Sequence, residues 1–62
     1  MCLSTVYKQV KAPENILMSN VQHIEVQDGQ LLLTDLMDRQ MVVEGRLISV
    51  DLVGGVAIIG QN

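Results

Sequence analysis

The chain has 62 residues and a net charge of −3 at pH 7; 48% of its residues are hydrophobic and 18% are charged. This composition argues against disorder, and the length predicts a single domain over residues 1–62. A core of this size rarely stabilises a fold alone, so a disulfide, a metal or a second subunit usually contributes. The single cysteine excludes an internal disulfide and leaves a partner subunit, a metal, or both.

The charge pattern argues against nucleic-acid binding. Four basic residues are scattered along the chain against seven acidic ones, whereas phosphate contacts normally require a basic face. Tyr7 is the only aromatic residue, so base stacking is nearly unavailable. A chain this short also leaves little room for the pocket of an ordinary enzyme, and we expect no enzymatic activity.

The apolar segments and the start of the chain indicate a compartment. Runs such as Leu31–Leu33 and Val56–Ile59 are far shorter than the ~20 residues of a membrane-spanning helix. The opening Met1–Ser4 lacks the basic stretch and apolar core of a signal peptide. We therefore expect a cytoplasmic protein with no membrane segment, in which Cys2 is a reduced thiol.

The first half of the chain predicts two strands and a hairpin turn. Leu3–Val10 is rich in β-forming residues and is followed by a loop around Pro13, which has no amide proton. We make no assignment for Ile16–Ser19, and Val21–Gln27 predicts the second strand. Asp28-Gly29 then predicts a hairpin turn, because glycine accepts the positive φ that tight hairpins require.

The second half predicts four more strands separated by turns. They cover Leu31–Leu36, Gln40–Val43, Arg46–Val53 and Val56–Ile59. The strand over Arg46–Val53 has the clearest alternation, with Ile48, Val50 and Leu52 on one face. Many short strands with regular turns predict an all-β fold, a small antiparallel SH3/Sm-like barrel of about six strands.

Two of these strands lack alternation. Leu31–Leu33 and Val56–Ile59 place apolar side chains on both faces, whereas a strand with one solvated face alternates. A loop could cover the outer face at a closed barrel end, or a second subunit could cover it. We favour the second subunit because the core is small, and we therefore predict a homodimer.

Cys2 is the position where residue type and place in the chain suggest metal chemistry. If Met1 is retained, the terminal amine, the Cys2 amide nitrogen and the Cys2 sulfur can close two fused five-membered chelate rings. If Met1 is removed, the amine and sulfur of Cys2 still close one ring. Such nitrogen and sulfur donors suit square-planar Ni(II) or Cu(II), and two chain starts related by a two-fold axis could supply four donors. The alternative is an ordinary thiol that packs as a small hydrophobic group.

The opening Met1–Tyr7, the strands around Asp28-Gly29 and the late segment Gly45–Leu52 resemble the CooT family. These are short nickel-binding accessory proteins of carbon monoxide dehydrogenase maturation. The resemblance implies a non-enzymatic metallochaperone, a homodimer that holds one Ni(II) through Cys2 of both chains, with the backbone around Met1 as nitrogen donor. It also implies a nickel-enzyme client, either carbon monoxide dehydrogenase or one of its maturation factors.

Other polar and sulfur-containing residues receive simpler interpretations. His23 shares a face of its strand with Glu25, either as a solvated side chain or as an auxiliary nickel ligand. Three methionines are expected to pack in the core: Met18, Met37 and Met41. Three aspartates are expected to face solvent: Asp35, Asp38 and Asp51. Two alternatives to nickel binding stay open, a small β-barrel RNA-binding module and a metal-independent protein–protein interaction module.

Overall fold

The computed structural model describes residues 3–61, so Met1, Cys2 and Asn62 lie outside the described residues. The described chain forms six strands and one short 3-10 helix, which confirms the predicted all-β class and the number of strands. The elements are β1 (Ser4–Lys8), η1 (Pro13–Asn15), β2 (Ile16–Gln27), β3 (Gln30–Asp35), β4 (Gln40–Glu44), β5 (Arg46–Asp51) and β6 (Val56–Gly60). None of the helical structure in residues 3–61 is long and apolar enough to cross a membrane.

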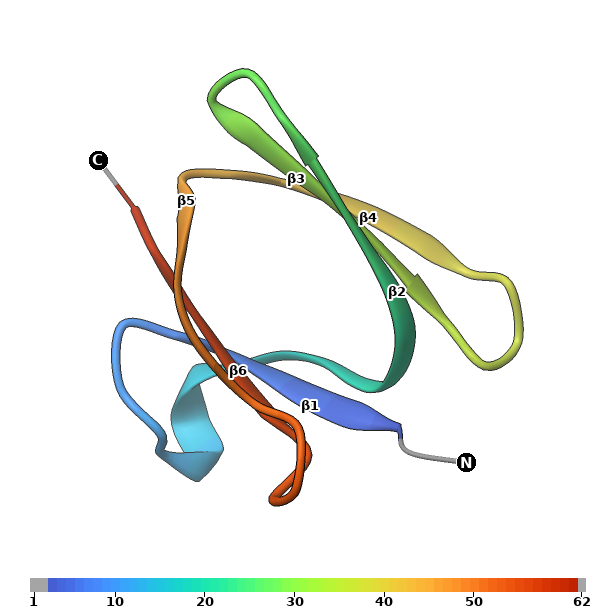
Figure 1. Ribbon diagram of the computed structural model, residues 1–62, viewed down its shortest axis with the longest axis vertical. Coiled ribbons are helices and arrows are strands. Elements are labelled where there is room, and N and C mark those ends of the chain that lie inside the picture. Colours follow the sequence, from blue (N-terminus) through green and yellow to red (C-terminus); the bar gives the residue numbers. More distant parts are fainter. Residues whose placement is uncertain (1–2, 62) are drawn as a thin grey trace.

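All six strands belong to one mixed sheet with the order β4-β3-β2-β1-β6-β5 (Figure 1). β1 and β6 are parallel, with Thr5 opposite Val56, and the other neighbouring pairs are antiparallel. The prediction of a wholly antiparallel sheet is therefore wrong. Short turns produce antiparallel neighbours, but β1 and β6 are separated by most of the chain, and a long connection permits parallel pairing.

The predicted closure into an SH3/Sm-like barrel is also wrong. β4 and β5 are the two edges of the sheet, although the sheet is strongly curled (Figure 1). The chain passes between them at Gly45, which has a φ of +143° and lies so close to the carbonyl oxygen of Gly60 that a Cβ would clash with it. Glu44-Gly45 therefore forms a corner that directs β5 onto β6, and not the hairpin turn that would pair β5 with β4.

β2 is longer than predicted because it includes the unassigned segment Ile16–Ser19. Its first part pairs with β1, from Ile16 opposite Tyr7 to Val21 opposite Ser4, and its second part pairs with β3. Asn20, just before this change of partner, has a φ of +56°. This backbone conformation and the register shifts on both sides bend β2, so one strand serves both partners.

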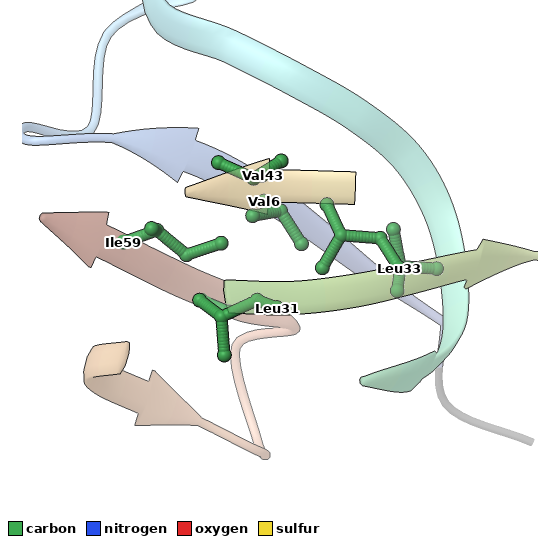
Figure 2. Close-up of a cluster of buried hydrophobic side chains, with 7 residues drawn as sticks. Val6, Leu31, Leu33, Val43 and Ile59 are labelled. Carbon is green, nitrogen blue, oxygen red and sulfur yellow. The ribbon is translucent and has the colours of Figure 1, made fainter. Parts of the chain in front are cut away.

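The core is a cluster of seven buried apolar side chains inside the curl of the sheet (Figure 2). They are Val6, Val21, Leu31, Leu33, Val43, Ala57 and Ile59. In β3, Leu31 and Leu33 are buried and Leu32 between them is half-buried. The outer faces of β3 and β6 are thus partly covered by the chain itself, and their contact with a second subunit stays a prediction.

β5 contributes no buried residue to this core. Leu47, Ile48 and Val50 are 37%, 54% and 44% exposed. The strand predicted over Arg46–Val53 ends at Asp51, and a register shift between Leu47 and Ser49 interrupts its pairing with β6. An edge strand with exposed apolar side chains is the result.

Candidate functional site

The start of β1 is the described part of the chain that lies nearest in sequence to the predicted ligands. Met1 and Cys2 themselves lie outside the described residues. Leu3 is half-buried, and β1 then begins with Ser4 opposite Val21 of β2 and Thr5 opposite Val56 of β6. The chain is therefore held between two strands within three residues of Cys2.

The turn between β3 and β4 is built around the carboxylate of Asp35, whose side chain is 4% exposed. Oδ1 accepts hydrogen bonds from the backbone N–H groups of Met37 (2.9 Å) and Arg39 (2.9 Å), and Oδ2 accepts one from Nε of Arg39 (2.8 Å). Burial raises the pKa of Asp35, but these hydrogen bonds and the charge of Arg39 outweigh burial and hold the pKa below its ordinary value. The prediction that Asp35 faces solvent is wrong, since three donors allow its charge to be buried.

The turn between β5 and β6 uses an exposed aspartate in a similar way. Oδ1 of Asp51 accepts hydrogen bonds from the backbone N–H groups of Val53 (3.1 Å) and Gly54 (2.9 Å). The N–H of Gly55 donates to the backbone oxygen of Asp51 at 2.8 Å. Side chain and backbone together thus fix the turn. Its tip carries Leu52 and Val53, which are 73% and 101% exposed.

His23 lies on the part of β2 that continues past Val21, the residue opposite Ser4. Its Nε2 is 3.0 Å from Oε1 of Glu25, and both side chains are more than half exposed. The predicted shared face of His23 and Glu25 is confirmed. A carboxylate partner of this kind can orient a metal-binding imidazole, and a role of His23 as a ligand stays a prediction.

The methionines and the remaining aspartate divide between the interior and the surface. Met18 packs against the core as predicted, but Met37 and Met41 are 73% and 37% exposed. The prediction of core packing is wrong for these two, because Met37 lies in a turn and Met41 lies on the edge strand β4. Asp38 is exposed, as predicted.

Within residues 3–61, no group of three or more His, Cys, Asp or Glu side chains could hold a metal ion. Every buried side-chain nitrogen or oxygen within the same residues has a hydrogen-bond partner.

One contact at the start of β1 was missed by sequence reasoning. Gly54-Gly55 is recognisable in the sequence as a turn, but its place beside the chain start is not. The N–H of Thr5 donates to the carbonyl oxygen of Gly55 at 2.8 Å. Parallel pairing of β1 with β6 produces this contact, and a local sequence pattern does not encode which distant strands pair.

Comparison with known proteins adds one positive result. A family model described as "CO dehydrogenase accessory protein CooT" matches residues 1–60 of the 62-residue chain. The match includes Met1, Cys2 and all six strands. Its description is that of an accessory protein and not of a catalyst. The comparison with curated proteins gives no match.

Proposed function

Because the chain belongs to the CooT family of CO dehydrogenase accessory proteins, we propose that it carries Ni(II) as cargo for the maturation of that enzyme. The proposed donors are the thiolate of Cys2 and the nitrogen atoms of the backbone around Met1. A thiolate flanked by amine and amide nitrogens suits the square-planar geometry that Ni(II) accepts. Because the thiol must lose its proton, nickel binding releases protons and weakens at low pH.

The carrier is proposed to be a homodimer that holds one Ni(II) between the two Cys2 residues. Two chain starts supply four donors, which one chain alone does not. The seven buried side chains form a small core, and the exposed apolar tip of the β5–β6 turn lies next to the turn residue that contacts Thr5. These features support a dimer in which burial of apolar surface adds to the stability of each chain.

The observation that carries this proposal is the family match across Met1 and Cys2. The anchoring of Thr5 between β2 and β6 supports it, since a ligand close to a fixed backbone loses less conformational freedom on binding metal. Handing the metal to a client then needs no chemical step in this protein, in keeping with an accessory role.

The test is a titration with Ni(II), followed by the ultraviolet charge-transfer absorption between thiolate and nickel. The parent chain is expected to bind one nickel per two chains, and Cys2→Ser is expected to lose tight binding and the absorption band. A chain with an acetylated amino terminus keeps the thiol and removes the free amine, so a weakened complex of that form identifies the amine as a donor. Binding by Cys2→Ser equal to that of the parent contradicts the proposal.

A metal-independent protein-interaction module is the second candidate, and the edge strand β5 favours it. All six residues of β5 are exposed, and three of them are large and apolar. An exposed apolar edge can accept a strand from another protein. This candidate predicts that Cys2→Ser retains the client interaction of the parent, which a pull-down with purified CO dehydrogenase maturation proteins would measure.

A further inference from the structure

We propose that Gly55 is a positioning residue, which fixes the backbone at Leu3 and so determines where the neighbouring Cys2 can hold its metal. The expected effect on nickel binding rests on the proposed function. The expected effect on the backbone at the chain start does not. Gly55 belongs to the β5–β6 turn, which contacts the first residues of β1 through the hydrogen bond of Thr5.

Gly55 is hydrogen-bonded to Thr5 and lies close to the two residues before it. Its carbonyl oxygen accepts the hydrogen bond of Thr5 at 2.8 Å. A Cβ built on Gly55 would lie 3.0 Å from the carbonyl oxygen of Leu3 and 4.0 Å from Cα of Ser4. A methyl group at this place would therefore require Leu3 or the turn to shift by a few tenths of an ångström.

The turn is the less movable of these two partners. Asp51 holds it through three hydrogen bonds, two to its carboxylate and one to its backbone oxygen. A Cβ on Gly54 would also come within 2.7 Å of Oδ2 of Asp51, so the turn is closely packed on that side. On the other side of the contact, Leu3 precedes the first paired residue of β1. A side chain at position 55 is therefore expected to displace Leu3, which is bonded directly to Cys2.

A matched pair of glycines separates this contact from the general cost of replacing a turn glycine. Gly55 has a φ of +69° and Gly29, in the β2–β3 turn, has a φ of +73°. Alanine is strained to a similar degree at both positions. A Cβ on Gly29, however, would meet no atom within 4 Å. Gly29→Ala therefore carries the backbone strain alone, and Gly55→Ala adds the contact with Leu3.

The experiment compares the parent, Gly55→Ala and Gly29→Ala in two measurements. Titration with Ni(II) measures metal affinity, and hydrogen exchange of the Thr5 amide in the metal-free protein measures the contact directly. We expect Gly55→Ala to lose at least as much thermal stability as Gly29→Ala, because it adds the contact with Leu3 to a similar backbone strain. Gly55→Ala is expected to lose nickel affinity by roughly 10-fold, as for other residues that orient a ligand, and to exchange the Thr5 amide faster. Gly29→Ala should keep both properties of the parent.

Equal Thr5 exchange in the two variants overturns the positioning role of Gly55, whatever the nickel result. If Thr5 exchanges faster in Gly55→Ala but nickel affinity is unchanged, the link from Leu3 to the metal is overturned. If the parent and Cys2→Ser bind nickel equally, the proposed function fails, and Thr5 exchange still decides whether Gly55 holds the chain start.

A second pair of variants covers the case in which Gly55→Ala does not fold. Asp51→Ala removes the acceptor for the N–H groups of Val53 and Gly54, and Asp51→Asn keeps an oxygen at that place. Asp51 is exposed, so both variants are expected to fold. Asp51→Ala should speed Thr5 exchange and weaken nickel binding, and Asp51→Asn should do neither. Parental behaviour of Asp51→Ala in both measurements overturns the inference.

Discussion

The turns after β3 and β5 are built alike and have different neighbours. Each follows an aspartate at the end of a strand, and in each that aspartate accepts backbone N–H groups from the residues of the turn. Asp35 is buried and also bonds the guanidinium of Arg39, whereas Asp51 is exposed. The β3–β4 turn is tied to β2 through Leu36, and the β5–β6 turn is tied to the start of β1.

From this difference we expect the β3–β4 turn to act mainly on stability and the β5–β6 turn to act on the proposed metal site. A buried carboxylate with three donors is costly to remove, because the donors then lose their partner in a part-buried turn. An exposed carboxylate with two backbone donors is cheaper to remove, since water replaces it. We therefore expect changes at Asp35 to affect stability most, and changes in the β5–β6 turn to affect the chain start most.

The largest expected effect is the loss of stability in Asp35→Ala. This change leaves the N–H groups of Met37 and Arg39 without their acceptor in a part-buried turn. We expect the substitution to lower Tm, measured by thermal unfolding, by roughly 5 °C or more for a domain of this size. Asp51→Ala is the matched change in the other turn and should lower Tm by clearly less. Equal losses would contradict the distinction between the two turns.

The second prediction concerns how the contribution of Asp35 to the free energy of unfolding depends on pH. Because the pKa of Asp35 is lower in the folded chain than in the unfolded chain, the unfolded state binds its proton first as pH falls. The stability that Asp35 supplies is therefore complete above the ordinary aspartate pKa of about 4, and it is lost as pH falls through the lower folded value. In urea unfolding, the difference between the parent and Asp35→Asn should be largest at pH 7 and should shrink toward pH 3. A difference that is constant over this range would show that the charge of Asp35 is not responsible.

The sequence predicts where the chain turns better than it predicts what each turn contacts. Asp28-Gly29, Met37–Arg39 and Gly54-Gly55 are all recognisable as turns, because their residues favour turn geometry locally. The burial of Asp35 is not recognisable, since it depends on donors that the folded turn presents. The parallel pairing of β1 with β6 is likewise a property of the whole topology, as is the open edge between β4 and β5.

The candidate site is predictable to a similar extent. Cys2 draws attention because a thiolate beside a terminal amine is a chelator whatever the fold. Gly55 does not, because its contact with Leu3 spans most of the chain and depends on β6 lying beside β1. A candidate ligand can thus be proposed from the sequence, whereas the contacts made by the residues next to it require the fold.

The third prediction tests whether the tip of the β5–β6 turn takes part in the proposed dimer. Val53 is 101% exposed, and it lies two residues from the glycine that contacts the chain start. If two chain starts meet, this valine is expected to be buried between the subunits, and Val53→Ser should raise the Kd of the dimer by roughly 10-fold, about 1.4 kcal/mol. Sedimentation equilibrium measures that constant. Val10→Ser is the control, because Val10 is 58% exposed and lies beyond the other end of β1. If both changes weaken the dimer equally, or if neither weakens it, the dimer is not built through this turn.

The smallest expected effect is that of His23→Gln on nickel affinity. His23 lies on the part of β2 beyond the residue opposite Ser4, which makes it the imidazole to test, but its Nε2 already faces Glu25 and its side chain is well exposed. A solvated imidazole that is not among the proposed donors should contribute little, so we expect affinity to fall less than about threefold, under ~0.7 kcal/mol. The titration used for Cys2→Ser measures this effect, with Glu25→Gln as the control that removes the carboxylate and keeps the ring. A loss in His23→Gln as large as that in Cys2→Ser would make His23 a ligand, and the nitrogen donors would then no longer come from the chain start alone.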